Sequence, residues 1–159
     1  DLYLELKNYG KAREYYEKAV SIVPQEETQS DNWRMSLTNL GRIYRQLKQY
    51  EKAEEYYKKR LEKFAEEGFS FNIGFALLDL AALYREQKQY DKAHEYFKKA
   101  FENKSFREGF LLTEFGRLYQ EQKQYDRARE YFEKSLAMSL KHKIPNVEME
   151  PNFLLGKLY

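Results

Sequence analysis

The chain has 159 residues, of which 34% are charged and 17% aromatic, with only seven glycines and three prolines. This scarcity of helix-breaking residues, beside many Glu, Lys, Tyr and Leu, predicts a mainly helical protein of one domain's length. The 28 basic and 26 acidic residues give a net charge of +2. Because both signs are spread along the chain, we expect neither nucleic acid nor a membrane surface as a partner. The absence of cysteine excludes disulfides, thiolate zinc sites and thiol nucleophiles.

One eleven-residue segment occurs four times along the chain. The copies are LKNYGKAREYY, LKQYEKAEEYY, QKQYDKAHEYF and QKQYDRAREYF, and they begin at residues 6, 47, 87 and 122. Intervals of 41, 40 and 35 residues are typical of repeat proteins, in which each repeat forms one supersecondary unit. The sequence therefore predicts a stack of repeats.

Each repeat is predicted to contain two helices joined by a short turn. In the first helix Leu37, Leu40, Tyr44 and Leu47 recur at three and four residues, which is the spacing of one buried helical stripe. Tyr50, Ala53, Tyr57 and Leu61 recur in the same way in the second helix. One such hairpin cannot bury its own apolar stripe, so its neighbours must cover it. In chain order we expect the end of a first repeat at 1–24, complete repeats at 31–67, 71–103 and 106–143, and the first helix of a further repeat at 147–159.

The pattern L-x2-L-G-x2-Y followed by A-x3-[YF] resembles the tetratricopeptide repeat. The matching residues are Leu37, Leu40, Gly41, Tyr44, Ala53 and Tyr57, then Leu77, Leu80, Ala81, Tyr84, Ala93 and Phe97, then Leu112, Phe115, Gly116, Tyr119, Ala128 and Phe132. The resemblance covers the whole chain and implies an all-α, right-handed superhelical solenoid of antiparallel helical hairpins over residues 1–159. The spacing is similar to that of the family's variety with about 40 residues per repeat. Both ends are incomplete hairpins, so we expect a fragment of a longer chain.

Some residues depart from the repeat pattern or explain it. The small residues Gly41 and Gly116 are expected to face Ala53 and Ala128 across each hairpin, where a larger side chain would separate the helices. Arg60 stands where the other repeats have a small residue, and we expect it to extend toward solvent.

No enzyme, cofactor or metal site is predicted. The fifteen tyrosines all fall at four equivalent positions of the repeats, so they are interpreted as packing between helices and not as a surface for base stacking. His94 is expected on a solvated face, because its equivalents in the other repeats are Glu54 and Arg129. Nothing near it has the spacing of a metal site or of a nucleophile–base pair.

In proteins with this resemblance the first helices line a curved groove. The residues of these helices that face away from the predicted core are Met35, Thr38, Asn39, Arg42, Arg45, Phe75, Leu78, Asp79, Arg85, Phe110, Thr113, Glu114 and Arg117. They predict an apolar edge and a basic strip interrupted by Asp79 and Glu114, which would suit a peptide with hydrophobic anchors and acidic or carbonyl acceptors. The alternative is that Phe75 and Phe110 pack against the neighbouring repeat. Family members that clamp a chaperone's C-terminal carboxylate use Lys, Asn and Arg at positions that hold Thr38, Arg42, Asp79, Phe110 and Glu114 here, so that function is disfavoured.

The resemblance implies a protein–protein interaction module, a scaffold or adaptor such as those used in signalling, whose partner is a peptide or protein segment of unknown identity. We expect it in the cytoplasm. The alternative is self-assembly through the open terminal repeats, which a monomer in sedimentation at high concentration would contradict.

Overall fold

The computed structural model describes residues 8–22, 31–103 and 108–142. Within these ranges the regular elements are all α-helices, and the described residues form no strand. The chain divides into two compact units, residues 1–69 and 70–159. The further helix predicted at 147–159 lies outside the described residues.

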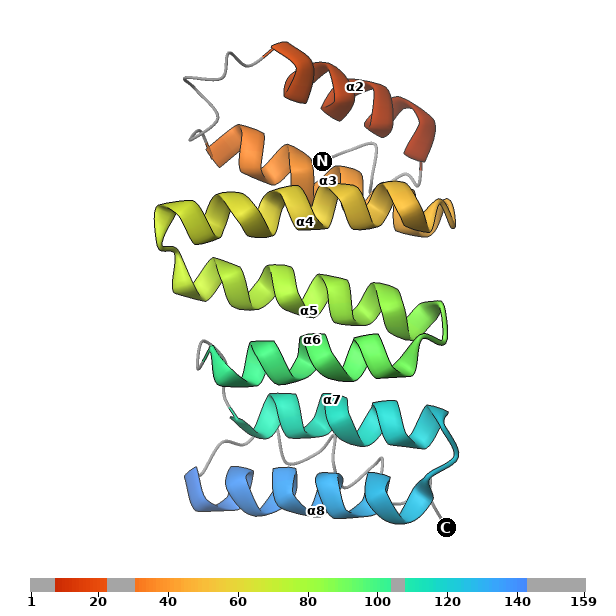
Figure 1. Ribbon diagram of the computed structural model, residues 1–159, viewed down its shortest axis with the longest axis vertical. Helices are drawn as coiled ribbons and strands as arrows, with labels where there is room; N and C mark the ends of the chain where they lie inside the picture. Colours follow the sequence, from red (N-terminus) through yellow and green to blue (C-terminus); the bar gives the residue numbers. More distant parts are fainter. Residues whose placement is uncertain (1–7, 23–30, 104–107, 143–159) are drawn as a thin grey trace. The chain divides into compact units, whose positions relative to one another are not determined.

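The first unit contains three helices, which Figure 1 shows in red to yellow. They are α2 (Tyr9–Ile22), α3 (Asp31–Gln46) and α4 (Tyr50–Glu67). Helix α3 packs against both α2 and α4, and α3 and α4 form an antiparallel hairpin. In the first unit Leu37, Leu40, Tyr44, Ala53 and Tyr57 of the predicted stripes are buried, whereas Leu47 is 37% exposed and Tyr50 and Leu61 are half-buried. Trp33, Ile43 and Phe64 also belong to this core.

The second unit contains two hairpins, which Figure 1 shows in green to blue. Their helices are α5 (Ser70–Glu86), α6 (Tyr90–Glu102), α7 (Glu108–Glu121) and α8 (Tyr125–His142). Contacts run from α5 to α6, from α6 to α7 and from α7 to α8. The first helices α5 and α7 run in the same direction, opposite to α6 and α8. Leu80, Phe97, Leu118 and Phe132 are among its fully buried side chains.

The unequal intervals between repeats have a local origin. Helices α4, α6 and α8 begin at residues 50, 90 and 125. Helix α4 has 18 residues and α6 has 13. The α4 helix ends at Gly68, whose φ of 73° is left-handed and stops the helix before α5 begins at Ser70.

Two glycines bring the helices of their hairpins together, and the nearest atoms across each hairpin belong to an aromatic ring of the second helix. A Cβ on Gly41 would overlap the ring of Tyr57, and a Cβ on Gly116 would overlap the ring of Phe132. The expected partners Ala53 and Ala128 are buried, but they are not the nearest atoms at these glycines. A flat ring one turn further along the second helix fills the space that the missing side chain leaves.

The turns within the three hairpins have the same strained residue. Lys48, Lys88 and Lys123 have φ values of 57°, 58° and 61°, in the left-handed region that favours glycine. In each turn the next residue donates its amide to a tyrosine carbonyl five residues earlier, as Gln89 does to Tyr84 at 2.9 Å. This hydrogen bond closes the end of the first helix as a Schellman motif does.

The tyrosines stack in pairs between the two helices of each hairpin. The ring centroids lie 5.4 Å apart for Tyr44 and Tyr56, and 5.3 Å apart for both Tyr84–Tyr96 and Tyr119–Tyr131. A cation lies over the first-helix ring of each pair: Lys52 over Tyr44, Lys92 over Tyr84 and Arg127 over Tyr119. The prediction that these tyrosines pack between helices is therefore confirmed for these six rings.

Two of the sequence-based expectations for single residues were wrong. Arg60 does not extend to solvent: it is 8% exposed, and its guanidinium lies 5.2 Å from the centre of the Phe64 ring. His94 is half-buried, with its ring 5.2 Å from Phe115 and 6.1 Å from Tyr119 of α7. Trp33, the chain's single tryptophan, is buried in the first unit with the Lys59 ammonium 5.7 Å from its ring centre.

We predict that Gly116→Ala lowers the free energy of unfolding by about 1–3 kcal/mol, because the added methyl group displaces the buried Phe132 ring. Gly109→Ala on the same helix is the control. Its Cβ would lie 3.7 Å from Ser135, an ordinary contact. Urea unfolding measures both variants, and equal stability of the two would contradict the close contact at Gly116.

We also predict that Lys88→Gly raises the free energy of unfolding by about 0.5–1 kcal/mol. Glycine removes the left-handed strain of about 1–2 kcal/mol, part of which its greater unfolded-state entropy offsets. Lys88→Ala keeps the strain and removes only the charge, so its stability should stay close to that of the wild type. The denaturation midpoints of the two variants separate strain from charge.

Candidate functional site

Helix α7 presents one continuous stripe of candidate residues. Phe110, Glu114, Arg117 and Glu121 follow one another at intervals of four, three and four residues, which places them on the same face over three turns. On α5, Phe75 and Glu86 occupy the positions equivalent to Phe110 and Glu121. The stripes of α5 and α7 are thus built in the same order.

The aromatic end of both stripes is solvent-accessible. Phe75 and Phe110 are each 41% exposed, although most large apolar side chains of their helices are buried. The ring of Phe71, one turn before Phe75, lies edge-on to it with centroids 4.9 Å apart. Exposed aromatic rings at equivalent positions are the kind of apolar surface that a partner can cover.

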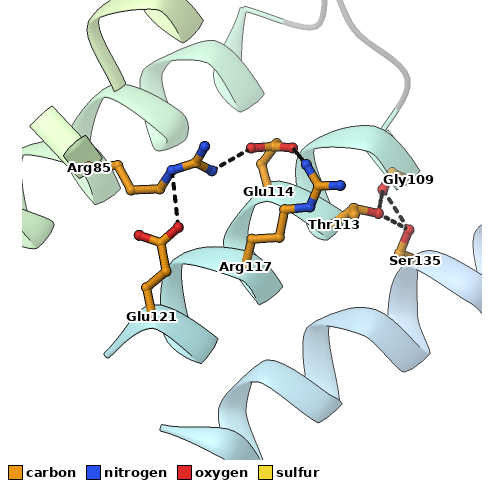
Figure 2. A network of polar contacts seen from close by, with 7 residues as sticks. All are labelled: Arg85, Gly109, Thr113, Glu114, Arg117, Glu121 and Ser135. Carbon is orange, nitrogen blue, oxygen red and sulfur yellow. Dashed lines mark hydrogen bonds and ion pairs between the residues drawn. The ribbon is translucent and has the colours of Figure 1, made fainter. Parts of the chain in front are cut away.

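At the other end, four charged side chains of α5 and α7 form a network, which Figure 2 shows. Arg85 donates from Nη1 to Glu114 Oε2 at 2.9 Å, and Arg117 donates from Nη1 to Glu114 Oε1 at 3.0 Å. Arg85 Nε also lies 3.5 Å from Glu121 Oε1. The structure thus brings together Arg85, Glu114 and Arg117, three of the residues that the sequence predicted for the groove.

The two carboxylates of the network have different surroundings. The Glu114 side chain is 12% exposed and accepts from two guanidinium groups, whereas the Glu121 side chain is 45% exposed. Burial raises the pKa of Glu121, and the carboxylates of Glu114 and Glu86 raise it further, against the opposing effect of Arg85 and Arg117. Burial is the main cause of this shift in pKa, and the two neighbouring carboxylates add to it.

The arginines predicted to grip a partner's carboxylate are thus already in contact with carboxylates of this chain. Glu114 takes a donor from each of Arg85 and Arg117. The network has two guanidinium groups and two carboxylates, so it is not a basic strip. The sequence already predicted that Glu114 interrupts the basic strip. The structure adds that Glu114 pairs with both arginines and that Glu121 lies beside Arg85.

Of the other candidates in the second unit, one is inside the protein. Thr113 is buried, with its hydroxyl 2.8 Å from that of Ser135 on α8 and 3.0 Å from the carbonyl of Gly109 (Figure 2). Its expected place on the groove is therefore corrected, because the small Ser135 leaves room for the hydroxyl to turn into the hairpin. Leu78 and Asp79 are half-buried on α5.

In the first unit, some of the candidates on α3 are exposed and one is buried. Met35 and Arg42 are exposed, and Arg45 is half-buried. Thr38 donates its hydroxyl to the carbonyl of Arg34 on its own helix at 3.0 Å. Asn39 is buried, and it lies close enough to Tyr16 of α2 to oppose the rise in pKa that burial gives the tyrosine hydroxyl.

The sequence analysis missed Glu86 and Glu121. They occupy the last turns of α5 and α7, seven residues after Asp79 and Glu114. An interval of seven residues returns to the same helical face, and this signal could have identified them. The equivalent residue of α3 is Gln46, so this position has an amide in the first unit and carboxylates in the second.

The described residues contain no group of three or more His, Cys, Asp or Glu side chains that could hold a metal ion. None of the described helices is both long enough and apolar enough to span a bilayer.

We predict that Glu114→Gln lowers the free energy of unfolding by about 2 kcal/mol, because it leaves two half-buried guanidinium groups without their shared carboxylate. Glu121→Gln should change it by no more than about 0.5 kcal/mol, since an exposed, longer ion pair contributes little and repulsion is relieved. Urea unfolding of both variants at neutral pH measures the difference. Equal losses would show that Glu114 does not hold the network together.

Comparison with known proteins gives a consistent family. Two family models, both described as tetratricopeptide repeat, match the chain, one over residues 1–66 and 36–105 and the other over 111–142. No curated protein matches the sequence.

Several solved structures are similar along nearly the whole chain. BtubC (BKLC) from P. vanneervenii has a TM-score of 0.79 at 23% identity and covers 100% of this chain and 68% of its own. A putative kinesin light chain from Podosopora anserina with nearly identical TPR-like repeats has a TM-score of 0.76 at 21% identity, over 99% of this chain and 80% of its own. MamA has a TM-score of 0.62 at 16% identity, over 99% of this chain and 91% of its own. These similarities show an all-α helical solenoid, and with the family models they establish that the chain belongs to the tetratricopeptide repeat family.

Proposed function

We propose that this chain is a protein–protein interaction module, a scaffold or adaptor, which holds a segment of a partner protein on the exposed faces of its first helices. Tetratricopeptide repeats generally mediate protein–protein interaction or scaffolding. The family is typically non-catalytic, and the proposal assigns the chain no reaction. A chain without cysteine is suited to a reducing compartment, so we propose the cytoplasm as its location.

The observation that carries this proposal is the exposure of Phe75 and Phe110. Both rings occupy the same position in their repeats, and both are 41% exposed. A ring that served only the core would be covered, as Phe97 and Phe132 are. Aromatic side chains lose little conformational entropy on binding and cover large areas, so they are frequent anchors of interfaces.

The second part of the argument is that these rings stand on rigid supports. Phe75 and Phe110 lie on helices whose opposite sides pack into hairpins, with Leu77 and Leu112 buried on the same helices. A partner segment would therefore meet a surface that is already ordered, which reduces the entropic cost of binding.

We predict that Phe75→Ala with Phe110→Ala abolishes retention of the partner in affinity purification from extracts of the organism that makes the protein. The loss of two anchors of about 1–2 kcal/mol each would weaken binding by more than tenfold. The matched control is Phe101→Ala, which removes a ring of similar exposure, 36%, from the second helix α6. Circular dichroism melts verify that all variants are folded.

Three outcomes are distinguishable. A protein retained by the wild type and Phe101→Ala, but lost by the folded double variant, supports the proposed face and names the partner. Equal retention by all three contradicts it. Unfolding of the double variant would show that Phe75 and Phe110 serve packing between repeats, which was the alternative interpretation.

A further inference from the structure

The chemistry of the partner segment can be narrowed from the charges on α7. The stripe runs from Phe110 at one end to Glu121 at the other, eleven residues or about 16 Å apart along the helix axis. It is therefore apolar at one end and charged at the other. Helix α5 runs in the same direction as α7. Phe75 and Glu86 occupy the equivalent positions of α5, so the same order is repeated on that helix.

The charge at the polar end is set by Glu114. Both guanidinium groups of the network donate to this carboxylate, at 2.9 Å and 3.0 Å. Glu121, whose side chain is 45% exposed, is the most exposed member of the network, ahead of Arg117 at 33% and Arg85 at 22%. A partner therefore meets a carboxylate first, and the arginines behind it already have carboxylate acceptors.

The carboxylate of Glu86 adds to the negative charge at this end of the face. Glu86 lies close enough to raise the pKa of Glu121, as Glu114 does. Within the second unit these three carboxylates outnumber the guanidinium groups of Arg85 and Arg117. An acidic partner residue placed here would be repelled, whereas an ammonium or guanidinium group would relieve the repulsion among the carboxylates.

We propose that the α5–α7 face binds a partner segment that has apolar side chains at one end and Lys or Arg at the other, and that Glu121 selects for this positive charge. The inference rests on the proposed function and specifies its ligand. A distance of about 16 Å corresponds to about five residues of an extended segment or about eleven of a helical one. Apolar and basic residues at either of these intervals are the expected signature.

The negative charge at these positions occurs in the second unit and is absent from the equivalent positions of the first. On α3 the positions equivalent to Glu114 and Glu121 are Asn39 and Gln46, both amides. Exchanging Glu121 for Gln therefore introduces the residue that the chain itself uses at this position, with little change in shape.

The experiment is selection of random peptides of about 12 residues, displayed on phage, against the full chain, since this length spans the face in either conformation. The baits are the wild type, Glu121→Gln, the double variant Phe75→Ala with Phe110→Ala and, as a charge-matched control, Glu133→Gln, an exposed carboxylate on the second helix α8. The wild-type pool should be enriched in Lys and Arg at the stated intervals from apolar residues. A synthetic peptide from this pool should bind Glu121→Gln about three- to fivefold more weakly in calorimetry, and Glu133→Gln unchanged.

The outcomes separate this inference from the proposed function. A pool enriched in Asp and Glu, or a basic peptide that binds wild type and Glu121→Gln equally, overturns the inference while leaving a binding face in place. If the wild type enriches no more binding peptides than Phe75→Ala with Phe110→Ala does, the proposed function itself is overturned. Added salt should weaken binding of the basic peptide to the wild type more than to Glu121→Gln, and this difference would confirm that the contact is ionic.

Discussion

The fold depends on a close contact between a helix backbone and an aromatic ring. Tyr57 and Phe132 each lie where a side chain on the facing helix would otherwise be, so Gly41 and Gly116 are required by the helix separation. The α5–α6 hairpin has Ala81 and Phe97 at the equivalent positions, and both are buried. This hairpin therefore has a methyl group where the other two have glycine. The separation of the helices within a hairpin is set by this pair of positions.

Once this contact fixes the two helices of a hairpin, the other faces of the first helix have defined roles. One face carries the buried leucines and another carries Phe75 or Phe110 toward solvent. Residues one repeat apart in the sequence thus occupy equivalent places on α5 and α7, which run in the same direction. The charged network between these helices is possible only because Arg85 and Glu114, 29 residues apart in the chain, end up on adjacent first helices.

Much of the fold could be predicted from the sequence, because the core follows the hydrophobic periodicity and each repeat shows the same pattern again. The helices, the turns at Lys-Gln and the buried stripe all follow from local spacing. The interactions of long side chains could not be predicted in this way. Arg60 and His94 turned toward aromatic rings, and Thr113 turned into its hairpin, because of neighbours brought close by tertiary structure. The same holds for the candidate face: its residues could be named from the sequence, but their pairing, and hence its charge, could not.

The position of Trp33 makes tryptophan fluorescence a signal of the first unit alone. This residue is the only tryptophan in the chain, and it is buried in the first unit, while the second unit has tyrosine as its only strongly absorbing fluorophore. Tryptophan emission therefore follows the environment of one unit, whereas helical ellipticity follows both. Where repeats unfold in sequence and not together, the two signals separate, and the order in which the ends of a solenoid open becomes visible without any label.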